Sequence, residues 1–120
     1  MYKLYGIKNC NTVKKAINWM NLSNIAFEFM DVKKDVLNID ILNDWVQNLP
    51  ENYSWESLVN KSGMTWRKLD DAQKESAENI NGALDLIIEK PSVMKRPVVV
   101  DGKKIFTIGF NETIFEEKFL

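Results

Sequence analysis

The sequence contains no histidine and only one cysteine, Cys10, among its 120 residues. The absence of histidine excludes Ser-His-Asp and Cys-His nucleophile pairs and removes nearly every kind of zinc site. A single thiol cannot form an internal disulfide, a CxxC redox pair or a cysteine-rich metal cluster. The acidic residues show no metal-ligand spacing either, so the sequence predicts a protein without a metal.

The chain also lacks a long apolar run and an excess of charge of either sign. No stretch approaches the roughly 20 apolar residues that span a bilayer, and no secretory signal is visible. The 16 basic and 17 acidic residues give a net charge of -1, which provides no general attraction to nucleic acid or to an acidic membrane. A lone cysteine without an export signal predicts a cytoplasmic protein, and a monomer is the default for this size and charge balance.

Glycine and proline are scarce, with five and three residues, which excludes a low-complexity or collagen-like chain. Hydrophobic residues make up 45% of the composition, as in an ordinary globular protein. A chain of this length can bury one core but is too short for two ordinary domains. We therefore expect a single domain that spans residues 1–120.

The hydrophobic pattern predicts a strand, a helix and a second strand in the first third of the chain. Apolar and polar side chains alternate in residues 2–5, and apolar side chains predominate in residues 27–30, as is typical of strands. Between them, apolar residues from Val13 to Met20 recur at helical spacing. This helix is expected to begin directly after Cys10, with Asn11 or Thr12 as its N-cap.

The remaining pattern predicts a helical middle followed by a hairpin and a final helix. The predicted elements are helices at 41–49 (capped by Asn38 and stopped by Pro50), 54–59, 70–79 and 83–88, strands at 98–100 and 103–107 around an Asp101-Gly102 turn, and a helix capped by Asn111. The order β-α-β, insert, β-β-α predicts an α/β fold with a mixed four-stranded sheet and helices on its faces. The insert, about residues 36–90, is expected to form a helical lobe on one edge.

Cys10 is the residue best placed for chemistry. It lies between the first predicted strand and the first helix, where unpaired N–H groups and the helix dipole favour an anion. Lys8 and Lys14 add positive charge nearby, so the pKa of the thiol is expected to fall below its ordinary value. The polar neighbours Asn11 and Thr12 suit an exposed loop, whereas the competing interpretation is a small buried thiol without chemistry.

Two further stretches contain cations whose role the residues alone leave open. The loop Lys95-Arg96-Pro97 precedes a strand and should approach Cys10, but the residues alone favour a surface turn with two solvated cations, because Lys-Arg pairs are common. In the stretch 65–69, Trp66 and Arg67 could contact an anion or a peptide. Helical spacing favours instead a Trp66 ring packed in the insert with Arg67 lying over it.

Four separated motifs resemble the arsenate-reductase-like (ArsC) family, closest to its YffB-type branch, which is related to the Spx regulators. They are the residues 5–16, 55–69, 95–100 and 108–110, in the order that the family has them over nearly the whole chain. The resemblance implies a thioredoxin-like fold with a helical insertion. It also implies that Cys10 is the nucleophile, that Pro97 is a cis proline facing it, and that Arg96 lines the same pocket.

The resemblance further implies a thiol oxidoreductase with glutathione as co-substrate. Cys10 would form a mixed disulfide, and a second glutathione would release it because the chain has no resolving cysteine. The site would comprise the nucleophile Cys10, the thiolate-stabilising residues Lys8, Asn11 and Thr12, and the glutathione- or substrate-binding residues Arg96, Pro97 and Arg67. The expected partners are glutathione or glutaredoxin and an oxidised thiol substrate.

Departures from the family pattern define the alternatives. Arsenate reductases of this family surround the oxyanion with several arginines, whereas this chain has only Arg67 and Arg96, so an arsenate-binding cage is incomplete. Spx regulators carry a CxxC switch, but Val13 stands at the second position here. The second hypothesis is a non-enzymatic, Spx-like regulatory module that binds a protein through the helical lobe.

Overall fold

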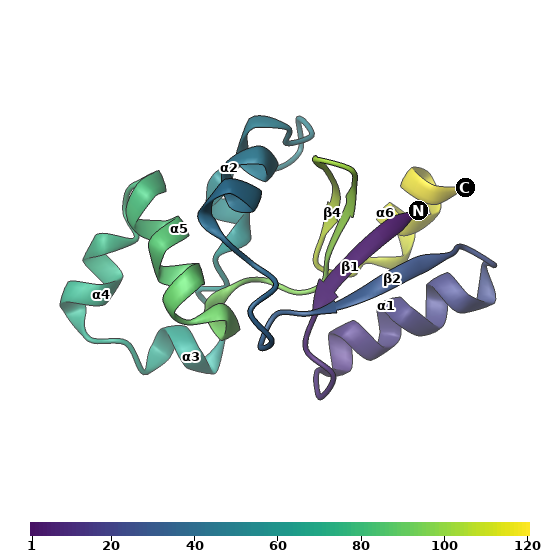
Figure 1. The fold of residues 1–120 in the computed structure, drawn as a ribbon. Helices are drawn as coiled ribbons and strands as arrows, with labels where there is room; N and C mark the ends of the chain where they lie inside the picture. The colour runs from purple at the N-terminus through teal and green to yellow at the C-terminus, as the bar shows by residue number, and fades with distance from the viewer.

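Four strands form one mixed sheet in the computed structural model, which describes residues 1–120 (Figure 1). They are β1 (Tyr2–Gly6), β2 (Phe27–Asp31), β3 (Val98–Asp101) and β4 (Lys104–Ile108). The order across the sheet is β2-β1-β3-β4, with β1 parallel to β2 and antiparallel to β3, and β3 antiparallel to β4. The predicted α/β class and mixed four-stranded sheet are confirmed.

The chain also forms six α-helices and two short 3₁₀ segments. They are α1 (Asn11–Leu22), α2 (Ile39–Gln47), η1 (Trp55–Leu58), α3 (Met64–Arg67), α4 (Asp71–Ser76), α5 (Ile80–Glu89), η2 (Pro91–Val93) and α6 (Glu112–Phe119). Helix α1 joins the parallel strands β1 and β2, and the elements from α2 to η2 form the insert between β2 and β3. None of the helices combines the length and the apolar character that a bilayer crossing requires.

Several predicted boundaries are confirmed by the hydrogen bonds that create them. The side chain of Asn38 accepts the Ile41 N–H at 2.9 Å at the start of α2. In the same way Asn111 accepts the Ile114 N–H at 3.1 Å and begins α6. These asparagines satisfy N–H groups that have no partner inside their helices, which is why the helices begin there.

Other local predictions were wrong. Neither Asn11 nor Thr12 caps α1, because Cys10 itself holds the extended N-cap position with φ -124° and ψ 120°. The predicted helix at 70–79 ends at Ser76, since Asn79 caps a separate helix, α5. The hairpin turn likewise lies one residue later than predicted.

That hairpin turn has Gly102 at its first central position. Asp101 pairs with Lys104, so the turn consists of Gly102 and Lys103 rather than Asp101 and Gly102. Gly102 has φ +62°, which a glycine adopts without steric cost. Residues 54–59, predicted as a short helix, contain the 3₁₀ turn η1.

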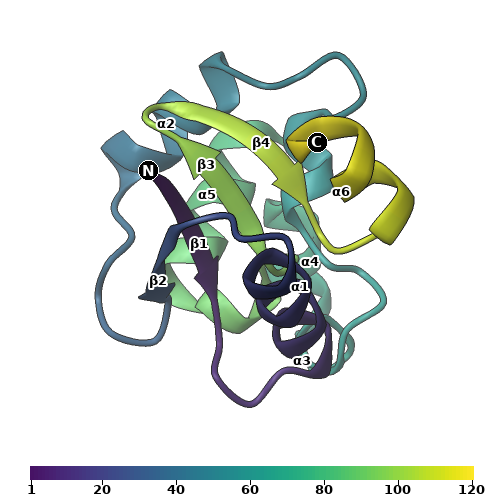
Figure 2. The same cartoon turned by 90° about the vertical axis from the view of Figure 1, so that its right-hand side faces the viewer.

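The two faces of the sheet contribute to different hydrophobic clusters, because neighbouring residues of a strand point in opposite directions. Leu4 and Val99 belong to a cluster of six buried residues with α1 and α6, which lie on the same side of the sheet in Figure 2. Tyr5, Val98 and Val100 belong to a cluster of 19 buried residues that includes the insert.

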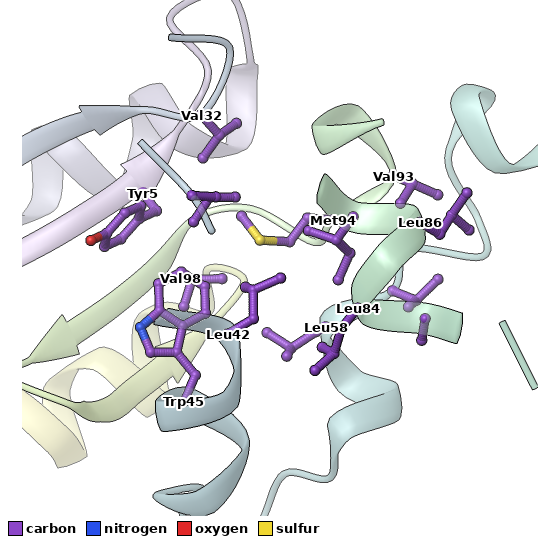
Figure 3. Packing of buried hydrophobic residues seen from close by; sticks show 14 of the residues in the cluster. Tyr5, Val32, Leu42, Trp45, Leu58, Leu84, Leu86, Val93, Met94 and Val98 are labelled. Carbon is purple, nitrogen blue, oxygen red and sulfur yellow. The ribbon is translucent and has the colours of Figure 1, made fainter. Parts of the chain in front are cut away.

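The insert therefore packs on the second face of the sheet through α2, while α3, α4 and α5 extend beside the sheet as a helical lobe (Figure 1). Figure 3 shows side chains from the strands and from the insert converging on one core. The rings of Tyr5 in β1 and Trp45 in α2 meet edge to face with their centroids 4.8 Å apart. The insert packs here because Tyr5 and its neighbours in β3 would otherwise expose an apolar face to water.

Three loops meet at one edge of the sheet. Because β3 runs antiparallel to β1 and β4, its first residue lies beside the last residues of both neighbours. The loop with Cys10 follows β1, the cis Arg96–Pro97 bond precedes β3, and Gly109 follows β4. The Gly109 N–H donates to the Pro97 C=O at 2.8 Å, which joins the second loop to the third.

Candidate functional site

Cys10 is a partly exposed, unpaired thiol at the N-cap of α1. Its backbone C=O accepts the Lys14 N–H at 2.9 Å, so the residue is fixed to the first turn of the helix. Its side chain makes no capping hydrogen bond of standard geometry. The sulfur nevertheless lies beside the N–H groups of Thr12 and Val13, which have no acceptor inside the helix.

The surroundings of Cys10 lower the pKa of its thiol. Partial burial acts in the opposite direction, because desolvation disfavours the thiolate. The backbone N–H of Val13, the hydrogen bond and charge of Arg96, and the backbone N–H of Thr12 together outweigh that burial. The lowered pKa favours the thiolate, which is the nucleophilic form of a cysteine.

Arg96 is the cation beside this thiol, and the chain around it holds its guanidinium in place. Its Nη1 atom donates to the C=O of Ser92 at 2.7 Å and to the C=O of Met94 at 3.1 Å. The side chain is half-buried, and its Nε atom is buried without a partner in the protein. Arg96 therefore carries a fixed positive charge and a further N–H group without a partner.

Pro97 is buried, whereas the three residues expected to stabilise the thiolate have exposed side chains. The side chains of Lys8 and Asn11 are exposed, and the charge of Lys8 is not among the causes of the lowered pKa of Cys10. Thr12 contributes through its backbone N–H, while its side chain is exposed. A role for the side chains of Lys8, Asn11 and Thr12 stays a prediction.

Arg67 is exposed at the end of α3 and has no side-chain hydrogen bond. The cation that lies over the Trp66 ring is Lys61, with Nζ 5.4 Å from the ring centroid, and not Arg67 as expected. Trp66 itself packs against the large hydrophobic cluster, as its spacing in the sequence indicates. Binding of glutathione by Arg67 stays a prediction.

Sequence reasoning missed two groups at this edge of the sheet. The N–H of Val13 stabilises the thiolate although Val13 is an apolar core residue, and only the position after Cys10 signals it. Lys61 and Lys95 line a common pocket, although 34 residues separate them along the chain. No group of three or more Cys, Asp or Glu side chains is arranged to hold a metal ion.

Comparison with known proteins identifies the family. The model of the ArsC family matches residues 5–117. The chain belongs to the ArsC family. An uncharacterised protein of Haemophilus influenzae is 39% identical over 99% of both chains. The global transcriptional regulator Spx of Streptococcus pyogenes is 30% identical over 93% of this chain and 80% of the regulator.

Solved structures of the family share the same architecture. A YffB protein superposes with a TM-score of 0.87 at 33% identity over the full length of both chains. An arsenate reductase (ArsC) related protein from Brucella melitensis gives a TM-score of 0.73 at 35% identity, covering 98% of this chain and 93% of its own. The fold is thus the thioredoxin-like fold of this family, whose members include both reductase-related proteins and regulators.

Proposed function

We propose that this protein is a glutathione-dependent thiol reductase that acts on mixed disulfides of glutathione through Cys10. The observation that supports the proposal is the lowered pKa of the Cys10 thiol at the N-cap of α1, beside the fixed charge of Arg96. In thiol–disulfide exchange the attacking group is the thiolate. A site that favours the thiolate is therefore suited to this reaction.

The reaction consists of two exchanges. First, the Cys10 thiolate attacks the glutathione sulfur of a mixed disulfide, forms a bond to it and releases the substrate thiolate, which takes a proton from water. Second, the thiolate of another glutathione attacks that same sulfur, forms glutathione disulfide and restores the Cys10 thiolate. The substrate sulfur is reduced and two glutathione sulfurs end oxidised. External glutathione is needed because the chain has no second cysteine.

Arg96 has a defined part in this proposal. Its charge favours the Cys10 thiolate before attack and after release. The charge of its half-buried guanidinium would also attract a carboxylate of the bound tripeptide. Arsenate reduction is not proposed, because Arg96 is the only arginine among the groups that act on Cys10.

The test begins with the pH dependence of Cys10 alkylation by iodoacetamide, with Cys10→Ser as the blank. We expect a midpoint below about 8.5, the ordinary value of a cysteine thiol. Turnover of a glutathione mixed disulfide in the presence of glutathione should then be lost in Cys10→Ser while its circular dichroism is unchanged. Turnover by Cys10→Ser, or an alkylation midpoint at or above the ordinary value, would reject the proposal.

A second candidate is a protein-binding module without catalysis, favoured by the 30% identity to an Spx regulator. It predicts an ordinary Cys10 thiol and a protein partner on the insert. Binding of that partner would survive Cys10→Ser and fail after substitutions on the exposed side of α3 and α4. The alkylation midpoint separates the two candidates before any partner is known.

A further inference from the structure

A pocket of about 320 Å³ lies between η1, the loop after η1, and the segment that precedes the cis proline. Val59 and Ile108 form its apolar part. Its polar lining consists of Tyr53, Ser57, Asn60, Lys61, Ser62 and Lys95. No aspartate or glutamate lines it, so the two lysines give the pocket a positive charge.

Each polar side chain of this pocket can donate a hydrogen bond. The Ser57 hydroxyl oxygen already accepts the Ser54 N–H at 3.1 Å, which leaves its own proton to donate. The Oδ1 atom of Asn60 accepts the Ser62 N–H at 3.2 Å, which leaves its NH₂ group free. Lysine side chains have donors only. A lining of this kind fits a ligand rich in acceptors and negatively charged, such as a carboxylate.

Both lysines are exposed, and the side chain of each contacts a neighbouring residue. The aliphatic part of Lys95 crosses Gly109, and its Cε atom lies 3.0 Å from the point where a Cβ atom of residue 109 would stand. The Lys95 N–H donates to the Leu58 C=O at 2.8 Å, which connects the backbone of Lys95 to the last residue of η1. Lys61 lies over the Trp66 ring, which favours a cation.

The pocket lies at the same edge of the sheet as Cys10. Lys95 precedes Arg96, and Ile108 is the last residue of β4. Arg96 acts on the Cys10 thiol, and its chain neighbour Lys95 lines the pocket. In glutathione the sulfur belongs to the middle residue, so a terminal carboxylate lies about two residues, or roughly 7 Å, from it. Glutathione with its sulfur at Cys10 can therefore direct a carboxylate towards Lys95.

We infer that the pocket of Lys61 and Lys95 binds a terminal carboxylate of glutathione while the sulfur reacts at Cys10. This inference rests on the proposed function and names where the co-substrate is recognised. It assigns recognition to two lysines outside the motif of Cys10, and it does not involve Arg67.

The test compares two disulfides that differ in charge. Mass spectrometry measures the rate at which Cys10 forms a mixed disulfide with glutathione disulfide or with neutral 2-hydroxyethyl disulfide. In both reactions the thiolate attacks one sulfur and the other half leaves as a thiolate. In the double variant Lys61→Gln, Lys95→Gln, we expect a roughly tenfold loss of rate with glutathione disulfide and an unchanged rate with the neutral disulfide. Lys68→Gln, at an exposed lysine outside the pocket, is the matched control.

Other results would overturn the inference. If the double variant reacts with both disulfides at the rates of the original protein, the proposed function stands but the two lysines do not bind glutathione. Equal loss with both would mean that the lysines act on the thiol itself. If the original protein reacts with neither disulfide, the proposed function fails, and binding of S-methylglutathione to Cys10→Ser then decides the inference. Amide resonances of Asn60, Lys61 and Gly109 must shift in that titration, and the absence of shifts contradicts it.

Discussion

Cys10 occupies the position at which an asparagine, aspartate or serine usually caps a helix, and its sulfur lies near the N–H groups of Thr12 and Val13. A neutral thiol is a weak acceptor, so it caps the helix poorly. A thiolate at the same place satisfies the N–H groups of Thr12 and Val13 far better. Deprotonation of Cys10 and the start of α1 therefore stabilise each other.

This coupling predicts a pH-dependent stability. Because the pKa of Cys10 is lowered in the folded protein, the thiolate stabilises the fold above the unfolded pKa, and this contribution is lost as the pH falls through the folded pKa. The free energy of unfolding, measured in urea, should therefore rise with pH more steeply for the original protein than for Cys10→Ser. The difference should grow towards about pH 8.5 and then level off. Parallel curves would contradict the coupling.

Arg96 and Lys8 should differ in their effect on the thiol. Arg96→Gln removes the charge and the hydrogen bond beside Cys10, so the alkylation midpoint should move up towards its ordinary value. Lys8→Gln removes an exposed charge that solvent screens, and the midpoint should move less. A larger shift in Lys8→Gln would favour the expectation drawn from the sequence.

Thr107 is fully buried in β4, and its hydroxyl has no hydrogen-bond partner. Thr107→Val replaces that hydroxyl with a methyl group of similar shape and removes an unsatisfied polar group. We expect a free energy of unfolding between unchanged and about 1 kcal/mol higher. Urea denaturation of both proteins tests this, and a clear loss of stability would mean that the hydroxyl has a partner in solution.

At the scale of elements, the contact between α4 and α5 depends on one glycine. A Cβ atom at Gly82 would stand 1.7 Å from the backbone oxygen of Ser76, at the end of α4. Gly82→Ala should therefore destabilise the protein by about 2–3 kcal/mol, although alanine favours helices elsewhere. Asn81→Ala, at an exposed position of the same helix, is the control and should change stability little. Thermal unfolding measures both.

The elements that the sequence predicts correctly are those with local causes. Asn38 and Asn111 cap their helices with their own side chains, and Pro50 follows the end of α2. The break at Ser76 was missed because it depends on Asn79 accepting the Gly82 N–H, and the cap at Cys10 was missed because its side chain makes no capping hydrogen bond. Alternation in β1 identifies two faces, but only the tertiary structure shows that the insert covers one of them.

The candidate site also contains residues that the sequence predicts and groups that it does not. Cys10 and Arg96 are recognisable in the sequence because each lies in a short motif, and the cis bond before Pro97 is present in the structure as the resemblance implies. The N–H of Val13 is a backbone group, so no pattern of side chains in the sequence predicts its role. The pocket of Lys61 and Lys95 requires two segments of the insert and the β3 loop to meet, which the hydrophobic pattern does not specify.

At the scale of the whole molecule, Trp45 joins the insert to the sheet. It is 2% exposed in the cluster of 19 residues and packs on Tyr5. Trp45→Ala should reduce the free energy of unfolding by about 3–5 kcal/mol. The original protein should unfold in a single transition by fluorescence and by circular dichroism, because both parts share this core. Two separate transitions would show that the insert unfolds by itself.

The shared core also limits how the reactive edge can work. The insert cannot swing away from the sheet without exposing the cluster that both contribute to, so it does not act as a hinged lid over Cys10. Hydrogen exchange should protect α2, α5 and the central strands to a similar degree. Under the proposed function, a substrate would meet a preformed surface, and the rate of its binding would depend on diffusion and charge. The rate of reaction with an anionic disulfide should consequently fall as ionic strength rises.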